Sequence, residues 1–101
     1  MPPSVKARTE MLNVFSTGAS QMVDAAKYNA MRQAYLAVLP AKPPGLTTAE
    51  AKAALLPHLP RTLFPGGATA GWWVKGVQLD LEARGMVVRE EGKPLRFRLA
   101  E

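Results

Sequence analysis

The last third of the chain constrains the fold most, because a helical segment closed by a glycine is followed there by a strictly alternating run. Residues 70–84 have the pattern of a long helix, and Gly85 follows it where a left-handed conformation is favoured. Residues 95–99 alternate apolar side chains with arginines, as a strand with one buried face does. With residues 86–90 as the partner strand and residues 91–94 as the turn, this pattern predicts a C-terminal β-hairpin.

The inner face of this hairpin is predicted to pack on helix 70–84 and on the first helix of the chain. Its apolar positions alternate along the second strand, and we assign one valine of the first strand to the same side. Alternation leaves the side of Met86 and Val87 open. The predicted inner residues are Val88, Leu95, Phe97 and Leu99.

Two further helices are predicted upstream from their capping residues. Asp24 is a good N-cap for a helix over residues 25–39, whose apolar positions follow helical spacing. Residues 40–45 contain three prolines and cannot continue that helix. Thr47 can then cap a second helix, with Glu50 three residues later completing a capping box. We therefore expect a single α+β domain with three main helices.

The N-terminal segment is the least regular part of the sequence. Residues 1–22 hold two early prolines and a polar cluster, with an apolar stretch over residues 11–15 between them. We interpret residues 1–22 as an N-terminal arm, with a short strand as one alternative, and residues 23–101 as the folded domain. The chain starts without a signal-peptide pattern and has no apolar run near the roughly 20 residues that span a bilayer. A cytoplasmic protein without a membrane partner is expected.

The composition argues against catalysis and against bound metals or cofactors. The 101 residues include no cysteine and one histidine, His58, so thiolate sites, disulfides and histidine clusters are excluded within one chain. Asp80 and Glu82 stand two apart on a helix and do not face each other as an acid–base pair would. We predict that the chain is not an enzyme and that His58 is a surface residue.

Two segments resemble parts of bacterial winged-helix regulators. Residues 81–89, LEARGMVVR, resemble the junction at which the recognition helix passes into the wing, and residues 45–50, GLTTAE, resemble the opening of the second helix. The resemblance covers about residues 25–99. The pattern of the whole chain resembles a family of small bacterial proteins of unknown function. The resemblance implies a winged helix-turn-helix with a C-terminal two-stranded wing and an N-terminal arm.

This resemblance makes DNA one candidate partner. The net charge of +5 and the pI near 10.0 favour polyanions, although mildly. Helix 70–84 would enter a groove of the DNA, and the basic wing would lie along the phosphates. Alternatively, the wing charges only keep an exposed edge from pairing with other chains. The candidate nucleic-acid residues are Lys75, Arg89, Lys93, Arg96 and Arg98.

The predicted outer face of helix 70–84 favours a different partner. Lys75 is its one cation, whereas Trp72 and Leu79 are large and apolar. A helix that is apolar on both sides is normally covered on both sides. We therefore expect Trp72 to be occluded by the N-terminal arm or by the same surface of a second copy. The alternative function is a protein-interaction or homodimerisation module, with Trp72 and Leu79 at the interface.

The segment before helix 70–84 invites comparison with a phosphate-binding loop. Residues 64–69, FPGGAT, precede a helix N-terminus, which attracts anions. The segment lacks the lysine and the spacing of known phosphate-binding motifs. We interpret it as a plain loop with Thr69 near the helix cap, and we predict no small-molecule ligand.

Overall fold

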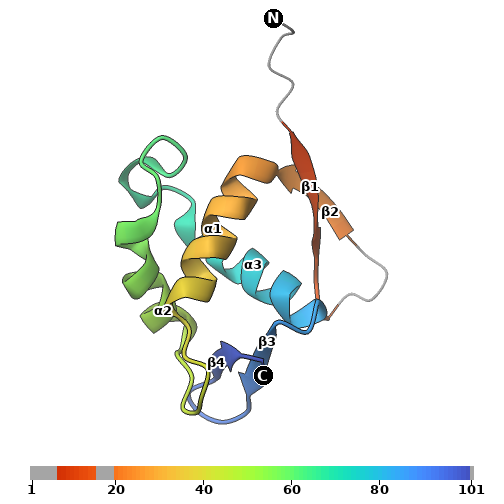
Figure 1. Cartoon of the computed structure of the whole chain (residues 1–101), viewed down its shortest axis with the longest axis vertical. Coiled ribbons are helices and arrows are strands. Elements are labelled where there is room, and N and C mark those ends of the chain that lie inside the picture. The colour runs from red at the N-terminus through yellow and green to blue at the C-terminus, as the bar shows by residue number, and fades with distance from the viewer. Residues whose placement is uncertain (1–6, 16–19, 101) are drawn as a thin grey trace, which may run out of the picture.

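The computed structural model describes residues 7–15 and 20–100, which form three α-helices and two small antiparallel sheets (Figure 1). The α+β class expected from the sequence is confirmed. Within the described residues, no helix is long and apolar enough to cross a membrane. The elements are β1 (Arg8–Leu12), β2 (Ser20–Asp24), α1 (Ala25–Val38), α2 (Thr48–Leu55), η1 (Leu56–His58), η2 (Pro65–Gly67), α3 (Ala70–Ala83), β3 (Val87–Glu90) and β4 (Arg96–Leu99).

The segment interpreted as an N-terminal arm contains a β-hairpin. Strand β1 pairs with β2 in antiparallel register, with Thr9 opposite Val23. Strand β2 crosses the arm boundary that the sequence placed after residue 22, so this hairpin is continuous with the helical body. Residues 1–6 and 16–19 of the arm lie outside the described residues.

The helix starts follow the predicted caps. The Asp24 carboxylate accepts hydrogen bonds from the backbone amides of Ala26 and Lys27 at 2.9 and 3.2 Å. The predicted capping box is confirmed: Thr47 Oγ1 accepts from the Glu50 amide at 3.1 Å, and the Glu50 carboxylate accepts from the Thr47 amide at 2.9 Å. The Thr47 amide also lowers the pKa of the Glu50 carboxyl. Both helices therefore begin where the local sequence satisfies their free amides.

The core lies between the three helices and the inner face of the β3–β4 hairpin. Helical spacing predicts a core face of α3 with Trp73, Val74, Val77 and Leu81, and all four are buried. Helices α1 and α2 close the core from the other side (Figure 1). The largest fully buried apolar side chains are Met31, Tyr35, Leu55, Val74, Val77, Leu81 and Phe97.

The inner face of the C-terminal hairpin differs from the prediction at one strand. Phe97 is 2% exposed, and Val87 is 4% exposed, whereas Val88 is half-buried. The register pairs Arg89 with Phe97 and Val88 with Arg98, so Val88 shares a face with the arginine. The prediction for Val88 is wrong, because alternation along β4 does not fix the parity of β3. The face that each β3 side chain occupies depends on the length of the turn, and five residues separate Glu90 from its partner Arg96. Leu95 and Leu99 pack against the core as expected.

A single linker residue forms an isolated bridge to this hairpin. The amide and carbonyl of Leu46 exchange hydrogen bonds of 2.8 Å with those of Phe97. Gly45 permits this contact, because a Cβ at that position would lie 2.1 Å from the Phe97 carbonyl oxygen. The bridge joins the linker before α2 to strand β4 of the two-stranded hairpin.

Replacing Phe97 with alanine should strongly destabilise the protein. The ring is buried, so Phe97→Ala is expected to lower the free energy of unfolding by about 3–5 kcal/mol in chemical denaturation. Val88→Ala, on the other face of the hairpin, is the control and should change it by less than about 1 kcal/mol. A loss below about 1 kcal/mol for Phe97→Ala would contradict the packing described here.

Candidate binding groove

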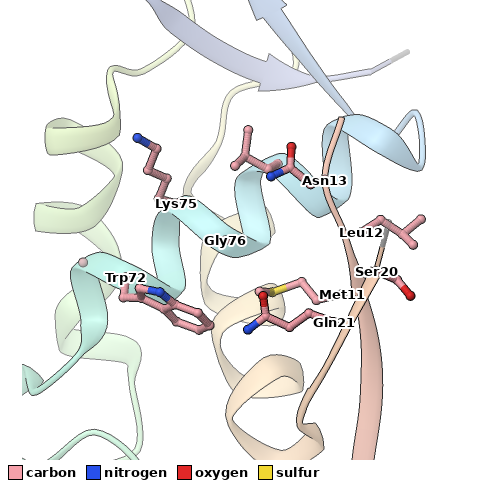
Figure 2. A pocket seen from close by; sticks show the side chains of 10 residues that line it. Met11, Leu12, Asn13, Ser20, Gln21, Trp72, Lys75 and Gly76 are labelled. Atoms are coloured by element: carbon pink, nitrogen blue, oxygen red, sulfur yellow. The ribbon is translucent and has the colours of Figure 1, made fainter. Parts of the chain in front are cut away.

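A groove runs between the N-terminal hairpin and the outer face of α3 (Figure 2). Its volume is about 400 Å³, which is in the range of sites that bind small ligands or a few side chains. One wall comes from the end of the hairpin and the other from α3. The lining residues are Met11, Leu12, Asn13, Ser20, Gln21, Gly71, Trp72, Lys75, Gly76 and Leu79.

The hairpin approaches α3 closely at a glycine. Met11 is buried, and its side chain lies over Gly76. A Cβ at Gly76 would be 2.8 Å from the Met11 methyl carbon, so any larger residue requires Met11 to move. This contact forms the floor of the groove and sets the distance between its walls.

Trp72 is the large apolar side chain left open at the groove. It is 52% exposed, and its indole extends toward the Met11 and Gln21 side chains (Figure 2). The ring rests edge-on against buried Trp73, with 5.0 Å between ring centroids, which limits its orientations. The described part of the arm does not cover Trp72, because β1 meets α3 at Gly76, one helical turn beyond Trp72. Occlusion of Trp72 by the same surface of a second copy stays a prediction. Leu79 is half-buried at the same surface.

The groove carries one charged side chain. Lys75 is exposed on α3 and points away from the hairpin at the rim (Figure 2). The other lining residues are apolar or neutral and polar, with Asn13, Ser20 and Gln21 supplied by the hairpin. The lining therefore has one positive charge that attracts an anion and no carboxylate that would compete with the anion for this lysine.

A buried carboxylate that the sequence reasoning missed holds the hairpin against α3. Asp80 has no exposed surface. It accepts hydrogen bonds from the Leu12 amide at 2.8 Å, from Arg84 Nε at 2.9 Å and from the Tyr28 hydroxyl. Arg84 also donates to the Glu10 carbonyl at 3.0 Å. Asp80 thus joins β1, α1 and α3 behind the groove. The detectable signal was an acid within the apolar face of α3, with an arginine four residues later.

The hydrogen bonds around Asp80 shift the ionisation of its partners. Burial raises the pKa of Tyr28, and its hydrogen bond to Asp80 raises it further. The same carboxylate raises the pKa of Arg84 through their hydrogen bond. Burial also raises the pKa of Tyr35, whose hydroxyl lies 3.5 Å from the buried Gln78 amide oxygen. Both tyrosines therefore remain neutral donors in the folded protein at neutral pH.

The arginines predicted to contact nucleic acid are paired with glutamates of the same chain. Arg89 forms a two-pronged ion pair with Glu82, with both N–O distances 3.0 Å, and its guanidinium lies over the Phe97 ring. That pairing raises the pKa of Arg89. The other two pairs are Arg96 with Glu50 at 3.1 Å and Arg98 with Glu90 at 3.2 Å.

The two predicted lysines occupy different places. Lys75 lines the groove, whereas Lys93 is exposed in the turn between β3 and β4. The candidate nucleic-acid residues therefore fall into two groups: two exposed lysines, and three arginines that form ion pairs within the chain. Trp72 and Leu79, the candidate interface residues, lie together in the groove.

His58 and the loop before α3 are the other possible sites in the sequence, and neither lines the groove. His58 is exposed in η1, and the loop before α3 contains the short turn η2. Thr69 is the N-cap residue of α3 but makes no side-chain capping bond; its hydroxyl donates to the Ala68 carbonyl instead. Among residues 7–15 and 20–100, no three histidine or acidic side chains gather as a metal site would require.

Comparison with known protein families gives a match over most of the chain. The sequence profile of a family of unknown function (DUF6958) matches residues 8–97. The chain belongs to this family.

The DUF6958 match extends from the start of β1 into β4 and includes every residue that lines the groove. Asp80 and the donors around it also lie within it. Comparisons with curated proteins and with solved structures gave no significant match. The matched region therefore includes both strands of the N-terminal hairpin, and the family is one of unknown function.

Removing the Asp80 carboxylate should loosen the hairpin. Asp80→Ala leaves the Tyr28 hydroxyl and the Leu12 amide without their acceptor, so we expect a loss of about 3–5 kcal/mol in the free energy of unfolding. Hydrogen exchange of the Leu12 amide should accelerate as well. Glu10→Ala, which removes an exposed carboxylate from the same strand, should stay within about 0.5 kcal/mol of wild type. Equal effects of the two substitutions would contradict the role of Asp80.

Proposed function

We propose that this protein is a non-catalytic interaction module that binds a short acidic and apolar peptide segment of a partner protein in the groove between β1–β2 and α3. The observation that carries the proposal is Trp72, a half-exposed indole held in place at the edge of a groove of about 400 Å³. Exposed apolar surface of this kind usually marks an interaction site.

The packing of Trp72 supports a role as an anchor for a bound side chain. Its ring stands at 81° to the ring of Trp73, which is itself in edge contact with the buried Phe64. A tryptophan fixed in this way loses little conformational entropy when a partner covers it. Tryptophan is also among the residues that contribute most to binding at protein interfaces.

The charge of the groove supports an acidic group in the partner. Lys75 is the cation of the lining, and no carboxylate belongs to the lining. A partner segment with an acidic side chain near an apolar one could place the first at Lys75 and the second on Trp72. Neutral polar side chains of the hairpin line the opposite wall and can hydrogen-bond to an extended peptide backbone.

The acids nearest the groove support a binding role over catalysis. Asp80 is occupied by three hydrogen-bond donors, and Glu82 is held by Arg89. A general acid or base has to reach the proton that it transfers. In this structure both carboxylates are used to hold elements together.

Selection of random displayed peptides on the immobilised protein tests the proposal. We expect enrichment of peptides that combine acidic and large apolar residues, and quenching or shift of tryptophan fluorescence when they bind. Trp72→Ala and Lys75→Glu should each weaken binding by about tenfold or more. Lys42→Glu makes the same charge change at an exposed linker residue and should leave the affinity unchanged. Selected peptides that bind Trp72→Ala as well as wild type would refute the groove as the site.

A second candidate function is nucleic-acid binding by a winged helix-turn-helix. The observation that favours it is the bridge between Leu46 and Phe97, which places one extended residue between α1 and α2 beside the β3–β4 hairpin, at the position of that fold's first strand. Helix, strand, two helices and a hairpin is the order of elements in that fold. The ion pairs of Arg89, Arg96 and Arg98 weigh against it, because phosphates would have to displace glutamates of the same chain.

Titration with duplex DNA separates the two candidates. Arg89, Arg96 and Arg98 are already paired with glutamates. We therefore expect a dissociation constant for duplex DNA above about 100 μM near physiological salt, and binding that weakens further as salt is added. Micromolar binding that disappears in the Lys75→Glu, Lys93→Glu double variant would instead favour the second candidate. Retention of peptide binding in Lys93→Glu serves as the control, since that residue lies outside the groove.

A further inference from the structure

The two outer edges of the N-terminal sheet are in different surroundings. The outer edge of β1 is covered by α3, because the Leu12 amide donates to Asp80 and the Glu10 carbonyl accepts from Arg84. Strand β2, Ser20–Asp24, has no neighbouring strand on its other side within the described part of the chain. An uncovered strand edge presents backbone donors and acceptors to other chains.

The register shows which residues of β2 direct their backbone groups to that open edge. The Ala25 amide donates to the Ala7 carbonyl at 2.9 Å, so hydrogen-bonded pairs follow at every second position of this antiparallel ladder. Thr9 with Val23 and Met11 with Gln21 are then the bonded pairs. The backbone groups of Ser20 and Met22 point away from β1, just as the Leu12 amide leaves the ladder to reach Asp80.

The side chains of β2 do nothing to protect this edge. Natural edge strands commonly carry lysine, proline or a bulge that prevents pairing with other chains. Strand β2 reads SQMVD, without lysine or proline, and Met22 at its centre is 56% exposed. An exposed methionine at the middle of an open edge favours contact with another strand.

We propose that β2 pairs with β2 of a second copy of this chain, antiparallel about a two-fold axis at Met22, to form a continuous four-stranded sheet. Such a pairing is self-complementary, as a two-fold interface requires. Met22 lies opposite Met22 of the second copy, and Asp24 lies opposite Ser20 of the second copy. No like charges meet, because Asp24 is the one charged residue of the strand.

The contact is small, and this sets its strength. One pair of five-residue strands buries less than the area of about 1,200 Å² at which stable interfaces begin. The dimer should therefore be in rapid exchange with the monomer, with a dissociation constant of roughly 100 μM. Ser20 and Gln21 of β2 also line the groove, but Trp72 lies on α3 and takes no part in the strand pairing, so Trp72→Ala leaves the association intact.

Light scattering with size-exclusion chromatography and sedimentation across roughly 10 μM to 1 mM protein tests the proposal. The mass should rise from 10.9 kDa toward twice that value. Amide exchange of Met22 should slow as the dimer forms. Met22→Lys places like charges opposite each other and should weaken the dimer by at least about tenfold. Gln33→Lys, the same charge change at an exposed site on α1, should leave it unchanged.

Two results would overturn the proposal. One is a constant monomer mass up to about 1 mM protein. The other is a dimer that Met22→Lys does not weaken while its circular dichroism shows a folded protein. Met22→Pro gives an independent measurement, since it removes the outward amide without removing a bond to β1. If the groove variants lose peptide binding but still form the dimer, that result bears on the proposed function and not on the dimer.

Discussion

The Asp80 carboxylate has no contact with solvent, and everything about the N-terminal hairpin follows from how that charge is satisfied. A carboxylate buried without partners is strongly unfavourable, so its donors are held in place as firmly as the charge itself. They come from β1, α1 and α3, which makes Asp80 the point where these elements are joined. Because the Leu12 amide is one donor, the hairpin cannot shift along α3 without uncovering the charge.

The position fixed by Asp80 determines both surfaces that the hairpin offers. Met11 is brought over Gly76, which leaves Trp72 open one turn away and forms the groove between them. The Leu12 amide and Glu10 carbonyl face α3, so the covered edge of the sheet is that of β1. The edge of β2 then necessarily faces outward. The buried carboxylate and the Met11–Gly76 contact therefore together position both the groove and the open edge of β2.

Local features of the fold could be predicted from the sequence, and long-range ones could not. The caps at Asp24 and Thr47 were predictable because each side chain bonds an amide two or three residues away. The predicted buried face of α3 followed from helical spacing. Val88 was assigned to the wrong face because its parity depends on a turn whose register the sequence does not determine. The partners of Asp80 were missed because Leu12 and Tyr28 lie 68 and 52 residues away.

The same distinction explains why the net charge does not show which cations of this protein are paired. The three arginines of the β3–β4 hairpin meet glutamates 7, 8 and 46 residues away, pairings that no local pattern reveals. Sequence-blind binding to phosphates needs several cations whose counterions are released together. Once the hairpin arginines are paired, the groove retains a single lysine beside a fixed indole. Under the proposed function, one charge next to one aromatic ring would distinguish partners by the placement of an acidic and an apolar group in a peptide segment.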